Sequence, residues 1–193
     1  MFLRNSSSLD TYRLDQMFRA HLHDWPHDNL LVAVRHARGA PFSGACHYRQ
    51  ARIYINLGRG LRYPYPLATH LARARATRFA WRRAAYSILL PDAYALALFL
   101  FLHEFYHWLV FRARRNPRQK EGRCDRFAAR ALVDGLGLAV VDADARPVER
   151  HEWDFQDLDG FVAAARRTRP ALGGASCDLT AARREWPATP DQR

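Results

Sequence analysis

The chain has 193 residues, of which 49% are hydrophobic and 12% aromatic, so it can bury a sizeable core and is not an intrinsically disordered chain. The net charge of +11 would suit a nucleic-acid-binding protein, but 29 of the 30 basic residues are arginine and they are spread along the chain, so GC-rich coding explains the bias equally well. The three cysteines are widely spaced and odd in number, which argues against a disulfide framework and favours a reducing, cytoplasmic compartment.

The N-terminal third combines one helix with three strands. Its first residues lack the apolar core of a signal peptide, and Ser8 can cap an amphipathic helix that runs to about Leu22. Residues 30–34, 45–49 and 52–57 are predicted to be strands, the last because apolar and polar side chains alternate along it. We expect these strands to form a short antiparallel sheet, with Arg52–Leu57 as the edge strand that an extended peptide could join.

The next segment leads to a long apolar helix. Residues 67–77 are predicted to be helical, and residues 79–90 are compatible with either a helix or a strand. A helix is expected to begin after Pro91-Asp92 and to end before Asn116-Pro117, because proline disfavours helical backbone in the residue before it. Within it, residues 93–102 are unbroken apolar, but a membrane span needs about 20 such residues. We therefore predict a buried core helix and no membrane span.

This helix carries the most informative motif of the chain, HEFYH at residues 103–107. Two histidines four residues apart on a helix project from the same face, so the imidazoles of His103 and His107 can bind one metal ion. Glu104 can reach a water molecule on that ion without binding the ion itself. Without a metal, a buried pair of histidines and a glutamate would need a private hydrogen-bond network to offset the cost of burial.

A second helix is predicted to start soon after Pro117 and to end near Gly135 or Gly137. It carries Glu121 and Asp125, which lie one turn apart and therefore share a face. The connection between the two helices is short, so they should pack closely and bring Glu121 near the histidine pair.

These residues resemble the gluzincin metallopeptidases, zinc enzymes with HExxH on one helix and a glutamate ligand on a following helix. Residues 121–128, EGRCDRFA, are similar to the E-x-x-A-D-x-F-A pattern of small gluzincins and to the corresponding run of ImmA/IrrE-like bacterial peptidases. The likeness covers roughly residues 90–135. It implies that Glu104 is the general base and that Asp125 accepts a hydrogen bond from a ligand histidine. The zinc ligands that it implies are His103, His107 and Glu121.

One position departs from the family pattern, and one functional residue of the pattern stays unassigned. Cys124 stands where the family usually has alanine, and we interpret it as a small, packed hydrophobic residue. The donor that would stabilise the oxyanion of the tetrahedral intermediate cannot be chosen by spacing. The candidates are Tyr86, Tyr94, Tyr106 and His151.

The C-terminal part is predicted to add a short strand at residues 138–141 and a helix at residues 158–167. Proline and glycine residues beyond it indicate a flexible tail. We therefore expect one zincin-like metallopeptidase domain over residues 1–167 and a tail over residues 168–193. The fold class is α+β, with a short antiparallel sheet packed on the active-site helix and the following ligand helix.

The function predicted from the resemblance is zinc-dependent hydrolysis of a peptide or protein substrate. One alternative is a non-catalytic zincin-like module, whose basic surface binds an acidic partner or nucleic acid. Another is a DNA-associated regulator that cleaves a repressor, by analogy with the ImmA/IrrE-like proteins. A catalytic zinc site keeps one position open for water, whereas a structural site is closed by a fourth protein ligand.

Overall fold

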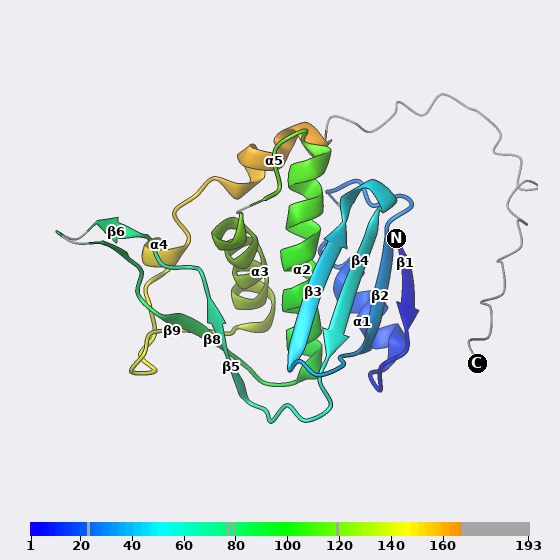
Figure 1. Cartoon of the computed structure of the whole chain (residues 1–193), viewed down its shortest axis with the longest axis horizontal. Coiled ribbons are helices and arrows are strands. Elements are labelled where there is room, and N and C mark those ends of the chain that lie inside the picture. The colour runs from blue at the N-terminus through cyan, green and yellow to red at the C-terminus, as the bar shows by residue number, and fades with distance from the viewer. Residues whose placement is uncertain (23, 77, 79, 119, 167–193) are drawn as a thin grey trace, which may run out of the picture.

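The computed structural model describes residues 1–22, 24–76, 78, 80–118 and 120–166. These residues form an α+β fold with five α-helices and nine β-strands (Figure 1). The helix α2 lies between a four-stranded sheet on one side and the helix α3 on the other. The predicted tail over residues 168–193 lies outside the described residues, as does residue 167.

The main sheet is mixed rather than antiparallel. Its strands, in spatial order, are β1 (Phe2–Asn5), β2 (Leu31–His36), β4 (Arg52–Leu57) and β3 (Phe42–His47). The pairs β1–β2 and β2–β4 are parallel, and only β3–β4 is antiparallel. The expectation of an antiparallel sheet was wrong for two reasons. It missed β1, which the helix α1 connects to β2 by a crossover that parallel pairing requires, and β4 pairs in parallel with β2 as well as antiparallel with β3.

The strand β4 is interior, so the prediction that Arg52–Leu57 forms the edge was wrong as well. It pairs with β2 on one side and with β3 on the other, and β3 is the edge strand beside α2. The alternation seen in the sequence is real: Ile53, Ile55 and Leu57 are buried, and Val32 and Val34 of β2 are buried beside them. Alternation identifies the buried face of a strand, but it does not show whether the strand pairs with other strands on one edge or on both.

The helices begin and end at residues with recognisable capping chemistry. The helix α1 (Thr11–Arg19) is capped by Asp10 rather than Ser8, and α2 (Ala93–Arg112) is capped by Asp92, as the sequence suggested. The helix α3 (Glu121–Leu136) ends at Gly137, whose φ of 66° favours glycine. The two N-terminal helices meet through Phe18 and Phe101, whose rings stack with centroids 4.3 Å apart.

A second sheet replaces the helix that was predicted for residues 67–77. Its strands, in spatial order, are β5 (Tyr65–Thr69), β8 (Tyr86–Leu90) and β9 (Val140–Val141), all antiparallel. The hairpin arm between β5 and β8 carries β6 (Arg75–Ala76) and β7 (Trp81–Arg82). Pairing with β8 favours the extended conformation over a helix, because it buries Leu67 and Ile88 together in the core.

The helix α2 is a core helix. It is 20 residues long and apolar enough to cross a membrane by composition, but 78% of its most apolar window is buried within the domain. Burial, rather than the shorter apolar run counted in the sequence, therefore supports the prediction of a core helix. The buried side chains of α2 contact both the main sheet and the helices around it.

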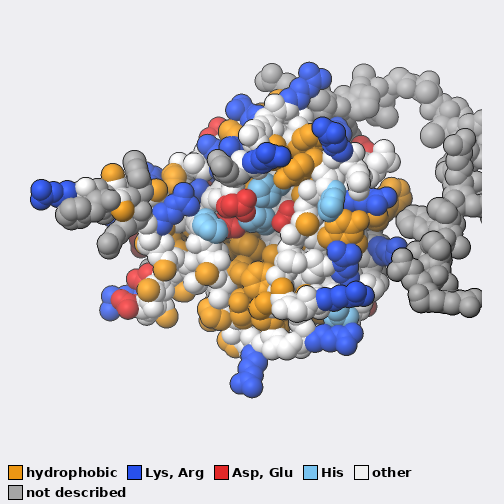
Figure 2. Space-filling model, in the orientation of Figure 1, with side chains coloured by type: hydrophobic (Ala, Val, Ile, Leu, Met, Phe, Trp, Pro, Cys, Tyr) orange, Lys and Arg blue, Asp and Glu red, His pale blue; other side chains and the backbone are white. Residues whose placement is uncertain are grey.

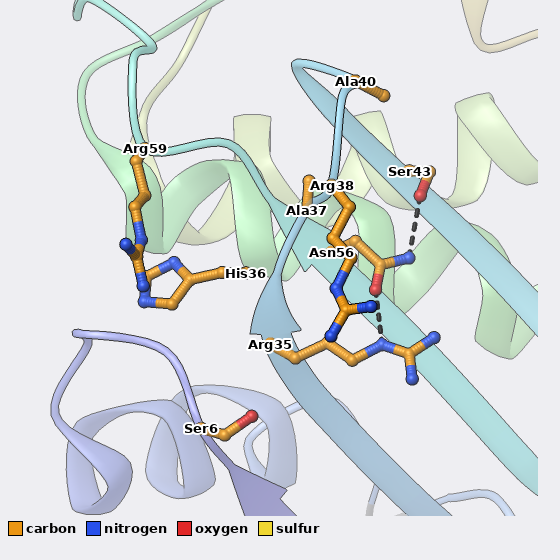
Figure 3. A pocket seen from close by; sticks show the side chains of 9 residues that line it. All are labelled: Ser6, Arg35, His36, Ala37, Arg38, Ala40, Ser43, Asn56 and Arg59. Atoms are coloured by element: carbon orange, nitrogen blue, oxygen red, sulfur yellow. Dashed lines mark hydrogen bonds between the residues drawn. The ribbon is translucent and has the colours of Figure 1, made fainter. Parts of the chain in front are cut away.

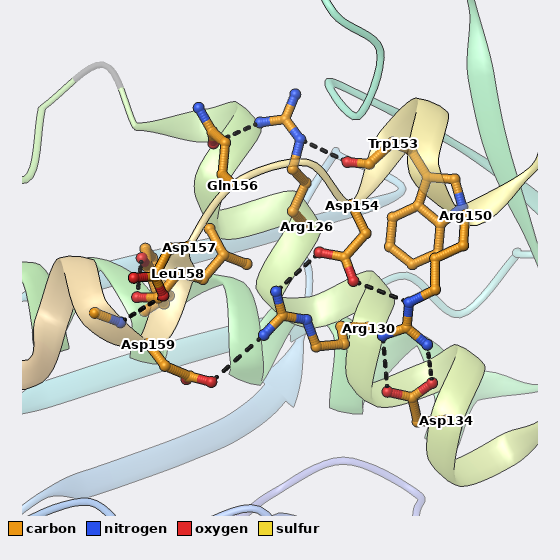
Figure 4. Close-up of polar contacts among 12 residues, drawn as sticks. Arg126, Arg130, Asp134, Arg150, Trp153, Asp154, Gln156, Asp157, Leu158 and Asp159 are labelled. Carbon is orange, nitrogen blue, oxygen red and sulfur yellow. Dashed lines mark hydrogen bonds and ion pairs between the residues drawn. The ribbon is translucent and has the colours of Figure 1, made fainter.

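Arginine side chains anchor α3 against the C-terminal helices α4 (Arg150–Trp153) and α5 (Leu158–Arg166), the latter through Arg130 and Asp159. Arg126 is 5% exposed and donates to the carbonyl oxygens of Trp153 and Leu71, at 2.8 and 2.6 Å. Arg150 of α4 forms a bidentate ion pair with Asp134 of α3, which adds a second link between these two helices (Figure 4). These bonds fix the helix that carries Glu121 and Asp125.

Candidate metal centre

The two histidines of the motif direct their Nε2 atoms toward the same side of α2, where Glu121 lies. His103 and His107 lie one turn apart on α2, with ring centroids 5.1 Å apart, and both are largely buried. Nδ1 of His103 lies 2.7 Å from Oδ1 of Asp125, and Nδ1 of His107 lies 3.0 Å from the carbonyl oxygen of Pro117. Both partners are acceptors, so both Nδ1 atoms carry the proton and both Nε2 atoms are left to bind a metal.

Glu121 faces these two nitrogens from the first turn of α3. Its Oε2 lies 3.1 Å from Nε2 of His103, and its Oε1 lies 3.4 Å from Nε2 of His107. Two ligand atoms bound 2.0–2.1 Å from a tetrahedral zinc ion are about 3.3 Å apart. Each of these two nitrogen–oxygen distances matches that spacing, and the three predicted ligand residues lie together.

The charges at this site fit a cation. Hydrogen bonds from His103 lower the pKa of Glu121 to about 2, against the opposing effect of burial. Burial disfavours the charged form of His103, but hydrogen bonds to Asp125 and Glu121 outweigh it and raise its pKa to about 10. Burial and the charge of His103 lower the pKa of His107. Without a metal, the extra proton on His103 thus offsets one of the two neighbouring carboxylate charges, and a metal ion would displace that proton.

Cys124 is a competing third ligand. A ligand atom of Cys124, of His103 and of His107 all lie within 4.8 Å of one another. However, Cys124 is completely buried, and burial raises the pKa of its thiol, whereas zinc binds the thiolate. The Glu121 carboxylate is already ionised and contacts Nε2 of both histidines, so it is the better-placed third ligand.

Glu104 lies beside the predicted ligands and against the edge strand of the sheet. A Cβ atom added to Gly44 of β3 would lie 2.5 Å from its Oε1, so the absence of a side chain at Gly44 makes room for the carboxyl group. Burial raises the pKa of Glu104 to about 7, although the charge of His103 opposes this. A carboxyl group with that pKa can both accept and donate a proton near neutral pH.

Asp125 connects the site to a histidine that sequence reasoning missed. Asp125 is only 4% exposed. Its Oδ1 accepts a hydrogen bond from His103, and its Oδ2 accepts one from the backbone N–H of His70 at 2.6 Å. Nδ1 of His70 lies 3.2 Å from the same Oδ2, while 61% of the side chain is exposed. His70 directly follows β5, in the segment that was predicted to be helical, so nothing in the pattern pointed to it.

Most of the expected oxyanion donors lie elsewhere. The hydroxyl of Tyr106 is buried and donates to the carbonyl oxygen of Leu158. Tyr94 accepts from the backbone of Asp10 and lies nine residues before His103 on α2, a rise of about 14 Å. His151 is exposed on α4 beside Glu152, and Tyr86 lies in β8.

Tyr48 is a second residue near the site that spacing did not reveal. It belongs to the short 3-10 helix after β3, and its ring stacks on Phe111 with centroids 5.5 Å apart. Burial raises its pKa, and the nearby charges of Cys46 and Glu104 add to the effect. Figure 2 shows histidine and acidic side chains gathered near the middle of one face, between basic side chains.

Comparison with models of known protein families, with curated proteins and with solved structures gave no match for this chain.

Proposed function

We propose that the protein is a zinc-dependent peptidase of the gluzincin type, with a zincin-like fold. The observation that carries the proposal is the convergence of Nε2 of His103, Nε2 of His107 and the Glu121 carboxylate at 3.1 and 3.4 Å, with Glu104 beside them. We assign the first three as metal ligands and Glu104 as the general base. A peptide or protein in the cytoplasm is the proposed substrate.

Each residue then has a defined task. A bound zinc ion would supply the Lewis acidity that polarises a substrate carbonyl and acidifies a water molecule. Glu104 takes the proton of the attacking water and passes it to the leaving amine, which a carboxyl group with a pKa near 7 can do. Asp125 holds His103 in the tautomer that presents Nε2. His70, exposed and held by the same carboxylate, is our candidate donor to the developing oxyanion.

The edge strand offers a way to bind the substrate. Among the described strands β3 pairs with β4 only, and Gly44 brings β3 directly against Glu104. A peptide that added to β3 as a further strand would have its backbone held by main-chain hydrogen bonds next to the general base. This arrangement favours an extended substrate segment.

A structural zinc site is the second candidate, and Cys124 is the observation in its favour. If the Cys124 thiolate took the fourth position, the site would have four protein ligands and no place for water. The protein would then be a non-catalytic module whose basic surface binds an acidic partner or nucleic acid. The contacts of the Glu121 carboxylate with Nε2 of both histidines favour the open, three-ligand site instead.

Metal analysis and peptide cleavage, performed on the same samples, test the proposal. We expect one zinc ion per chain in the wild type and in Glu104→Gln, with cleavage of a random peptide library by the wild type alone. A chelator should abolish the cleavage, and added zinc should restore it. A wild-type protein that binds zinc but cleaves no peptide, or a Glu104→Gln variant that cleaves at the wild-type rate, would refute the enzymatic assignment.

A further inference from the structure

A basic hollow lies at the carboxyl ends of the parallel strands, away from the metal centre. It has a volume of about 900 Å³. The segments that follow β1, β2 and β4 form much of its wall, together with the start of β3 (Figure 3). Ligands of open sheets commonly bind outside the carboxyl ends of parallel strands, because loops from several strands converge there. The residues that line it are Ser6, Arg35, His36, Ala37, Arg38, Ala40, Ser43, Asn56 and Arg59.

The charge of this hollow is one-sided. Three arginines and one histidine line it, and among the described residues no carboxylate does. Within the described part of the chain, none of the recorded ion pairs involves Arg35, Arg38 or Arg59. By contrast, Arg130 and Arg150 at the other end of the domain each contact an aspartate (Figure 4). Like charges gathered in one hollow repel each other, and a bound anion would relieve the repulsion.

Neutral side chains hold one of these arginines in place. Nε of Arg35 donates to Oδ1 of Asn56 at 2.6 Å, and Nδ2 of Asn56 donates to Oγ of Ser43 at 2.8 Å (Figure 3). The guanidinium also lies over the ring of Tyr54, 4.5 Å from its centroid. Its position is therefore set by contacts that leave its charge uncompensated, and the bond through Nε leaves the two terminal nitrogens for a ligand.

The two loops that carry Arg38 and Arg59 are locked to each other. The backbone N–H of Gly58 donates to the carbonyl oxygen of Pro41 at 2.7 Å. A Cβ atom at Gly58 would overlap that oxygen, so only glycine permits so close an approach of the two backbones. This contact ties the loop that bears Arg59 to the loop that bears Arg38, and both arginines border the same hollow.

We propose that this hollow binds a compound with several phosphate groups, such as a nucleoside triphosphate or inorganic polyphosphate. Arginine forks match phosphate oxygens in pairs, and three of them require a ligand with more than one negative charge. The hollow is separate from the metal centre: Ser43 lines it, whereas the next residue of β3, Gly44, lies against Glu104. Successive residues of a strand face opposite sides, so β3 separates the two sites.

The test is a calorimetric titration of the full-length protein with inorganic triphosphate and, separately, with ATP. The informative variant is Arg38→Gln/Arg59→Gln, and the matched control is Arg114→Gln/Arg146→Gln, which removes two exposed arginines outside the hollow. Both variants leave the proposed metal ligands intact, so any heat from extraction of bound metal should be the same in both. Circular dichroism and thermal unfolding verify that each variant is folded.

We expect saturable 1:1 binding of triphosphate by the wild type, an affinity at least about tenfold lower in Arg38→Gln/Arg59→Gln, and little change in the control. Tighter binding of ATP than of triphosphate would indicate a nucleotide, and equal binding would indicate polyphosphate alone; either supports the site. Equal losses in both variants, or no saturable binding by the wild type, overturn it. Duplex DNA that binds through Arg38 and Arg59 while triphosphate does not would also overturn it, in favour of a nucleic-acid surface.

Discussion

The contact between Gly44 and Glu104 allows the proposed general base to be displaced without substituting Glu104 itself. In Gly44→Ala, the new methyl group would lie 2.5 Å from Oε1 of Glu104 and 2.8 Å from its Cγ. Restoring an ordinary contact of 3.4 Å requires a movement of about 0.9 Å, and the flexible end of the glutamate is the part that can move. A misplacement of about 1 Å at a reacting group costs on the order of 100-fold in rate, or about 2.7 kcal/mol of transition-state stabilisation.

We therefore expect Gly44→Ala to lower kcat by about 100-fold while its zinc content stays at the wild-type level. The same substitution at Gly60, where an added Cβ would meet nothing within 4 Å, is the matched control and should leave kcat unchanged. Steady-state kinetics on a peptide cleaved by the wild type, with metal analysis and thermal unfolding of all three proteins, decide the question. A Gly44→Ala enzyme with wild-type kcat would show that the position of the Glu104 carboxyl group does not limit catalysis.

Four further substitutions test the roles of the surrounding residues. Glu121→Ala should lose bound zinc, whereas Cys124→Ala should retain it. The reverse result by metal analysis would make Cys124 the third ligand in place of Glu121, and loss of zinc from both variants would indicate a closed site with four protein ligands. Asp125→Asn should weaken zinc affinity by roughly 10–100-fold in competition with a chelator, and unchanged affinity would contradict its role in orienting His103. His70→Ala should lower kcat with little change in KM or zinc content, and a rise in KM alone would instead assign His70 to substrate binding.

The two-helix core of the site could be predicted from the sequence because its signals are local. The spacing of His103 and His107 fixes a shared helix face, and the prolines and glycines at the helix ends bound both elements. Because the connection between α2 and α3 is short, the first turn of α3 lies close to α2, and Glu121 faces the histidines. Helical period and chain continuity were sufficient for these three residues.

The sheets could not be predicted in the same way because pairing is decided by distant partners. β1 has only four residues, and its place beside β2 depends on the crossover through α1. β5 was expected to be helical, yet it pairs with β8, 17 to 25 residues away in the register from Thr69↔Tyr86 to Tyr65↔Leu90. Pairing over such separations leaves little trace in local composition. His70 was missed for the same reason, because its position depends on where β5 ends.

Asp125 shows why these long-range errors matter for function. Its buried carboxylate accepts from His103 on α2 and from the backbone of His70 at the end of β5, so one side chain positions both a proposed ligand and a proposed catalytic donor. Glu104 is positioned from the opposite direction, by β3 at Gly44. The two sheets thus supply what the helical motif lacks: one provides the edge strand beside the general base, and the other provides an exposed imidazole. An HExxH sequence that arose by chance would not be expected to lie beside both an edge strand and an exposed imidazole. The presence of both therefore favours a catalytic site over a private hydrogen-bond network.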